Sequence, residues 1–90
     1  MLLGRFAADP AMEELEAAVR SREASGIFNQ AHTLKGVTEN LGLKPLYETV
    51  SVLVEITRKG TIEGADEAFV QVKLAYAEVI NLLERVTLEQ

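Results

Sequence analysis

The chain has 90 residues, 48% of them hydrophobic and 26% charged, which suits one small domain with a packed core. It contains no cysteine, which excludes disulfides and thiolate zinc sites, and its net charge of −5 argues against nucleic-acid binding. No run of about eighteen apolar residues occurs, so no membrane span is predicted, and Met1–Phe6 is too short for a signal peptide. We therefore expect a single cytoplasmic domain over residues 1–90.

The first half of the chain predicts two helices. Asp9 can cap the free N–H groups of a helix over Pro10–Arg20, and proline fits its first position. After the polar interruption Ser21–Ser25, a second helix is predicted over about Ala24–Leu41. The expected core residues recur three and four positions apart; they are Met12, Leu15, Ala18 and Val19 in the first helix, and Ile27, Ala31, Leu34, Thr38 and Leu41 in the second.

Two more helices are predicted in the second half. Gly42 ends one helix and Pro45 begins the next, which runs over Pro45–Lys59. The connector Gly60–Gly64 then leads to a long final helix over Ala65–Val86. The expected core residues are Leu46, Val50, Leu53, Val54 and Thr57 in the third helix, and Ala65, Phe69, Val72, Tyr76, Val79, Leu83 and Val86 in the fourth.

The predicted fold class is all-α. Four amphipathic helices with short connections bury their apolar stripes most simply as an up-down antiparallel four-helix bundle. Leu2, Leu3 and Phe6 predict a short extra N-terminal helix that packs on this bundle. The valine-rich stretch Val50–Ile56 does not alternate apolar and polar residues, so it does not predict a strand.

The only histidine, His32, is the residue best suited to chemistry. It follows the predicted core residue Ala31, and the rotation of about 100° per residue turns it toward solvent. Its neighbours on that face include Phe28, Asn29, Lys35 and Gly36. Glycine costs a helix interior about 1 kcal/mol relative to alanine, so Gly36 predicts a need for space beside the imidazole.

These residues predict a phosphoryl-accepting site. A neutral imidazole is a nucleophile near neutral pH, and Lys35 lies one turn away, where its ammonium can reach the oxygens of a phosphoryl group on His32. The sequence contains no phosphate-binding glycine loop and no acidic metal cluster, so we expect no autonomous kinase activity and no cofactor of its own. Donor and acceptor active sites would come from other proteins or domains.

The segment Ala31-His32-Thr33-Leu34-Lys35-Gly36, followed by Asn40-Leu41-Gly42, resembles the signature of histidine-containing phosphotransfer (HPt) domains of two-component phosphorelays. The resemblance implies a helical bundle in which His32 becomes phosphohistidine, Lys35 assists the phosphoryl charge and Gly36 gives steric access. It also implies receiver domains as partners, with Mg²⁺ bound in the receiver. Two departures stand out: Val37 replaces a residue that is often small, and the leading helix is reduced to Met1–Phe6.

Residues around this motif receive weaker assignments. Phe28 is either a core residue at the rim or, together with Asn29, a contact for a docking partner. Tyr47 is assigned to the core or its edge. Lys44, Arg58 and Lys59 would help attract an acidic partner, although favourable charge at a helix C-terminus also explains the last two.

The expected function is that of a monomeric relay protein that takes a phosphoryl group from one receiver aspartate and passes it to another. A non-catalytic module that binds receivers is one alternative. Another is the phosphoacceptor domain of a larger histidine kinase, although the initial Met1 and the lack of a kinase segment favour a free-standing protein. A metal-carboxylate bundle needs Glu three residues before His on two helices, whereas here Asn29 precedes a single histidine.

Overall fold

Four helices make up the part of the chain that the computed structural model describes, which is the backbone of residues 11–89 and the side chains of residues 11–85. No strand occurs among these residues, so the all-α prediction is confirmed for them. The predicted N-terminal helix at Met1–Phe6 and the cap at Asp9 lie outside the described residues. The helices are α2 (Ala11–Ser21), α3 (Ala24–Leu41), α4 (Lys44–Arg58) and α5 (Ala65–Glu89).

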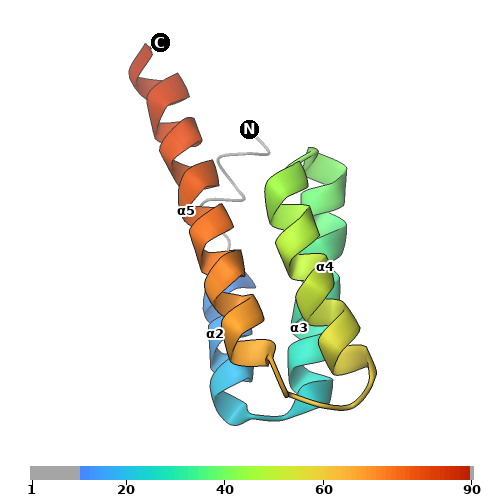
Figure 1. Cartoon of the computed structure of the whole chain (residues 1–90). Coiled ribbons are helices and arrows are strands. Elements are labelled where there is room, and N and C mark those ends of the chain that lie inside the picture. The colour runs from blue at the N-terminus through green and yellow to red at the C-terminus, as the bar shows by residue number, and fades with distance from the viewer. Residues whose placement is uncertain (1–10, 90) are drawn as a thin grey trace.

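The helices pack side by side with short turns between them (Figure 1). Helix α3 contacts α2 on one side and α4 on the other, and α5 closes the bundle by contacting α4 and α2. At 25 residues α5 is much longer than the 11 residues of α2, and its last turns extend beyond the ends of α3 and α4 (Figure 1). The central position of α3 matters for the site, because both α2 and α4 pack against this helix.

The turn between α3 and α4 is set by Gly42. Its φ of 70° lies in the left-handed region that favours glycine. Its N–H donates to the carbonyl of Glu39 at 3.2 Å, and the N–H of Leu43 donates to the carbonyl of Thr38 at 2.9 Å. This Schellman-type pair satisfies the last carbonyls of α3. Helix α4 begins at Lys44, one residue before the predicted start, so that Pro45 lies in its first turn.

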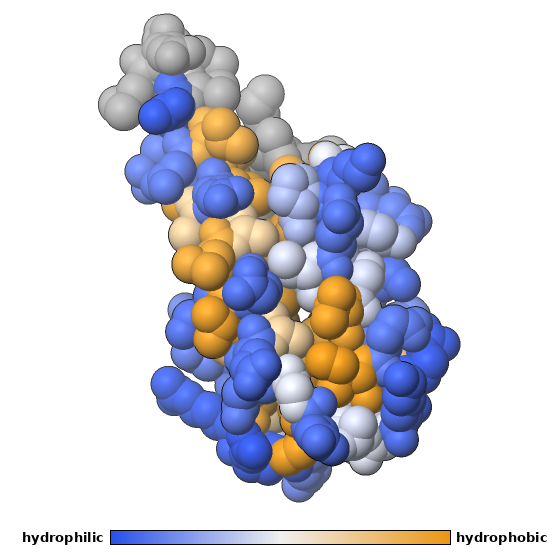
Figure 2. Space-filling view, in the orientation of Figure 1, coloured by the Kyte–Doolittle hydropathy of each residue, from blue (hydrophilic) through white to orange (hydrophobic). Residues whose placement is uncertain are grey.

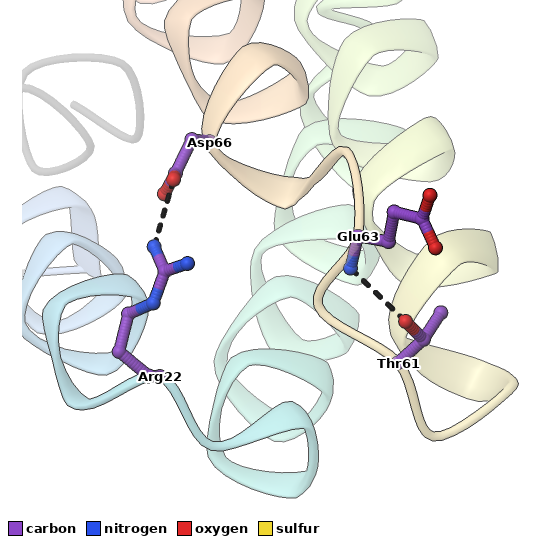
Figure 3. Close-up of polar contacts among 4 residues, drawn as sticks. All are labelled: Arg22, Thr61, Glu63 and Asp66. Carbon is purple, nitrogen blue, oxygen red and sulfur yellow. Dashed lines mark hydrogen bonds and ion pairs between the residues drawn. The ribbon is translucent and has the colours of Figure 1, made fainter.

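Figure 3 shows how the α2–α3 turn is tied to the start of α5. Arg22 has a φ of 62°, which is unusual for a residue with a side chain, and its guanidinium lies 2.7 Å from a carboxylate oxygen of Asp66. In the nearby α4–α5 connection, the N–H of Glu63 donates to the hydroxyl of Thr61 at 3.0 Å. The Arg22–Asp66 contact joins segments that are 44 residues apart in the sequence, whereas the Thr61–Glu63 contact shapes the α4–α5 connection itself.

The core is formed by one apolar stripe from each helix, largely as predicted. Two threonines are also buried, and each satisfies its hydroxyl inside its own helix: Thr38 donates to the carbonyl of Lys35 and Thr57 to that of Leu53, both at 2.9 Å. Ala68 and Ala75 belong to the core although we did not predict them. The buried apolar residues are Leu15, Val19, Ile27, Ala31, Leu34, Leu46, Val50, Leu53, Val54, Ala65, Ala68, Phe69, Val72, Ala75 and Val79.

Some predicted core residues lie at the edge of the core instead. They are only partly buried because each sits at an end or flank of its helix; they are Met12, Ala18, Leu41, Tyr76 and Leu83. Several large apolar side chains on α4 and α5 are exposed, namely Val52, Val70, Leu74 and Leu82. Figure 2 shows apolar residues of this kind among hydrophilic ones on the α4–α5 face. Within residues 11–89, none of the helices has the length and apolar character that crossing a membrane requires.

Candidate functional site

His32 lies in the middle of α3 and its side chain is exposed. The reason is the helical rotation: Ala31 and Leu34 on either side of it are fully buried, so His32 is turned away from the core. Exposure of this side chain agrees with the prediction from the sequence. No hydrogen bond or ion pair ties the imidazole to the described residues, so its nitrogens are open to a reaction partner.

The imidazole is oriented by an aromatic neighbour. The ring of Phe28, one turn earlier, stacks on His32 with 5.5 Å between ring centroids and 29° between ring planes. Side chains in a helix lean toward its N-terminus, which brings His32 over the turn that contains Phe28. Phe28 is half-buried and packs against the core, which agrees with a core residue at the rim, while its role as a contact for a docking partner stays a prediction.

A cation from α4 lies against the same aromatic ring. The guanidinium carbon of Arg58 is 5.8 Å from the centroid of Phe28, and its Nε lies 3.3 Å from a carboxylate oxygen of Glu55. The Arg58–Phe28 contact joins the C-terminal turn of α4 to α3 and brings a positive charge near the His32–Phe28 stack.

Lys35 lies against a second aromatic ring from α4. Its Nζ is 5.7 Å from the centroid of Tyr47, and the lysine is half-buried. No carboxylate of the described residues pairs with this ammonium. Tyr47 also lines a surface hollow of about 320 Å³ between the end of α3 and the start of α4, together with Thr38, Glu39, Gly42 and Lys44. The structure thus places the ammonium of Lys35, which we expected near His32, against the ring of Tyr47 on α4.

Gly36 leaves an open notch on the exposed face of α3. A Cβ built at this position meets no other atom within 4 Å, so nothing inside the described chain requires glycine there. The alternative reason for Gly36, close packing against another helix, is therefore wrong for the described residues. The space is on the solvent side, where a side chain at position 36 would lean back over the turn of His32.

The other predicted neighbours divide between the two faces of α3. Asn29 is exposed, and its carbonyl accepts a hydrogen bond from the hydroxyl of Thr33 at 3.0 Å. Val37, the departure from the motif, is half-buried and packs against the core. The larger residue at position 37 therefore contributes to the bundle interior.

Sequence reasoning missed the contribution of Tyr47 and understated that of Arg58. Both residues lie on α4 and form cation–π contacts with α3. Tyr47 contacts Lys35, which follows His32 in the sequence, and Arg58 contacts Phe28, which precedes it. The two contacts pair residues of α3 and α4 that lie about equally far from the connecting turn. Distance from Gly42 was thus a usable signal, although the rotation of α4 also had to be known.

The arrangement offers an exposed nucleophile, two cations held on aromatic rings, and a gap beside the nucleophile. Within residues 11–85, no group of three or more His, Cys, Asp or Glu side chains is placed to hold a metal ion. This chemistry suits the acceptance of a group from another molecule.

Comparison with known proteins agrees with the motif. The family model of the Hpt domain matches residues 7–85, which is most of the chain and includes all four described helices up to the last turn of α5. Neither the curated proteins nor the solved structures contain a match to this sequence. The chain belongs to the Hpt domain family.

Proposed function

We propose that this chain is a single phosphotransfer domain, an up-down antiparallel bundle that accepts a phosphoryl group on His32 from a receiver-domain aspartate and passes it to another receiver. The observation that carries the proposal is the exposed imidazole of His32 in mid-helix beside the open notch at Gly36, in a member of the Hpt family. Hpt domains serve histidine-containing phosphotransfer in phosphorelays and interact there with receiver domains.

The chemistry is a reversible displacement at phosphorus. The unprotonated imidazole nitrogen of His32 attacks the phosphorus of an aspartyl phosphate in line with the leaving oxygen. A nitrogen–phosphorus bond forms, the phosphorus–oxygen bond to aspartate breaks, and the carboxylate leaves with the electron pair. In the second transfer, a carboxylate oxygen of another receiver attacks the same phosphorus, and the electrons of the nitrogen–phosphorus bond return to the imidazole.

The receiver would supply what this chain lacks. Mg²⁺ bound in the receiver would neutralise the phosphoryl oxygens, and the receiver would fix the in-line geometry. Lys35 would add positive charge from this side, and Phe28 and Asn29 would contact the docked receiver. Because receiver active sites are acidic, the cations Lys35 and Arg58 near His32 favour docking despite the net charge of −5.

The proposal includes a monomeric protein that acts in the cytoplasm. A relay protein must release each partner, so we expect a small and short-lived interface with the receiver. Light scattering at concentrations used for transfer assays should give the mass of one chain, 9.9 kDa. A stable dimer would contradict this part of the proposal while leaving the transfer chemistry intact.

The test is phosphoryl transfer from a panel of phosphorylated receiver domains. The wild-type chain should gain label and the receiver should lose it, whereas His32→Gln should gain none and still bind receivers. Ser25→Ala, an exposed substitution near the start of the same helix and outside the site, controls for general effects on α3. Equal loss of phosphate from the receiver with wild type and His32→Gln would indicate a module that only binds receivers.

A further inference from the structure

The Lys35 ammonium has a defined resting place on Tyr47. Its Nζ lies 5.7 Å from the ring centroid, which is within the distance at which a cation is attracted to an aromatic face. No carboxylate among residues 11–85 competes for it. The half-buried position of Lys35 means that its aliphatic stem is also held against the bundle.

This resting place lies on α4, beside the C-terminal part of α3. Tyr47 lines the hollow formed with Thr38, Glu39 and Gly42, at the C-terminal end of α3. His32 lies in the opposite direction along α3, one turn before Lys35. In the unphosphorylated protein the ammonium therefore lies against a ring of α4, although Lys35 occupies a position on α3 that neighbours His32.

We propose that Tyr47 is a positioning residue that holds Lys35 in the unphosphorylated state and gives it up to the phosphoryl group on His32. The inference rests on the proposed function, because it needs a phosphoryl group at that histidine. A phosphoryl group carries a full negative charge beside Lys35, and a hydrogen bond between two charged groups is stronger than the attraction of an ammonium to a neutral ring. The side chain is flexible and long enough to turn from one partner to the other.

A thermodynamic consequence follows from this exchange of partners. The Lys35–Tyr47 contact stabilises only the unphosphorylated state, so it opposes phosphorylation of His32 by its own free energy. Removing the ring should move the transfer equilibrium toward phosphohistidine. A partly exposed cation–π contact corresponds to a shift of about two- to fivefold.

The experiment compares the equilibrium ratio of phosphohistidine to aspartyl phosphate, using one receiver domain that exchanges label with the wild-type chain. Tyr47→Leu should raise the ratio about two- to fivefold, and Tyr47→Phe, which keeps the ring, should leave it unchanged. In a Lys35→Gln background, Tyr47→Leu should have no effect, since the cation is absent. Tyr76→Leu is the matched control, because Tyr76 is half-buried like Tyr47 but lines a separate hollow between α2 and α5.

A spectroscopic measurement keeps the test independent of how well Tyr47→Leu folds. In the wild-type chain, the ring of Tyr47 should shift the NMR signals of the Lys35 ε-methylene upfield. After phosphorylation with phosphoramidate, this upfield shift should disappear. Two results would overturn the inference and leave the proposed function standing. One is that the Lys35 ε-methylene signals do not change when His32 is phosphorylated. The other is that Tyr47→Leu and wild type give the same equilibrium ratio of phosphohistidine to aspartyl phosphate. Absence of phosphate on His32 would instead refute the proposed function.

Discussion

The imidazole of His32 stacks on the ring of Phe28, with 5.5 Å between ring centroids and 29° between ring planes. One face of the histidine is thereby covered by its own helix, while the side toward Gly36 is open. Arg58 lies against the same phenyl ring at 5.8 Å, so α4 also supports the stack. The relationship holds the proposed nucleophile in a limited range of orientations before a partner arrives.

Replacing Phe28 by leucine should loosen the histidine without opening the core. Leucine keeps an apolar side chain where Phe28 packs against the core, so we expect a loss of about 1 kcal/mol in the free energy of unfolding. Loss of the aromatic stack should slow phosphoryl transfer about two- to tenfold. Phosphoryl-transfer assays quenched at successive times measure the transfer rate. The ring-current shifts of the His32 C–H signals in NMR spectra report whether the stack is present.

Phe69→Leu serves as the control for this substitution, because Phe69 is buried on α5 and lines the hollow between α2 and α5. It should lower stability at least as much and leave the transfer rate unchanged under conditions where the protein stays folded. Unaltered His32 signals in Phe28→Leu would show that the stack does not orient the imidazole in solution.

A side chain introduced at position 36 should raise the stability of the protein and lower its rate of phosphoryl transfer. Gly36→Gln replaces glycine by a good helix former in open space, so the free energy of unfolding should rise by about 0.5 kcal/mol. The new side chain leans back over the turn of His32 and should reduce transfer about tenfold or more, a cost of ~1.4 kcal/mol or above in the transfer complex.

The chain offers a matched glycine for that experiment. Gly26 also lies in α3 and also has nothing within 4 Å of a built Cβ. Since it is on a different face from His32, Gly26→Gln should stabilise the helix without slowing transfer. Equal transfer rates for both variants would mean that the partner does not approach through the notch.

Arg22 gives a prediction about the fold alone. Its φ of 62° costs a residue with a side chain about 1–2 kcal/mol, and glycine would remove that cost. The ion pair with Asp66 is exposed, with 56% and 64% of the two side chains accessible, so it contributes little. Arg22→Gly should therefore be about 1 kcal/mol more stable than Arg22→Ala in chemical denaturation. A less stable glycine variant would show that the ion pair, or the entropy of the unfolded chain, outweighs the backbone strain.

Most of the fold was predictable from local signals. Gly42 and Pro45 marked the α3–α4 turn, and the predicted extent of about Ala24–Leu41, between the polar interruption and Gly42, agrees with α3 in the structure. Ala68 and Ala75 were missed because alanine is common on both faces of a helix, so its burial depends on which neighbour packs there. The extra N-terminal helix at Met1–Phe6 stays a prediction, since it lies outside the described residues.

The site was predictable where it lies within one helix. Rotation along α3 placed His32 and Gly36 on the exposed face, and both are exposed in the structure. The contacts of Lys35 with Tyr47 and of Arg58 with Phe28 cross from α4 to α3, so they depend on the relative rotation of two packed helices. The relative rotation of two helices cannot be predicted from the pattern of residues in one of them.

The most direct test of the central claim is to map the phosphate after incubation with phosphorylated receivers, by mass spectrometry under conditions that preserve phosphohistidine. His32 is the only histidine of the chain, so the account predicts a single acid-labile phosphoryl group at this residue, which a second receiver then removes. Phosphate on any other residue, or none from a broad panel of receivers, would contradict it.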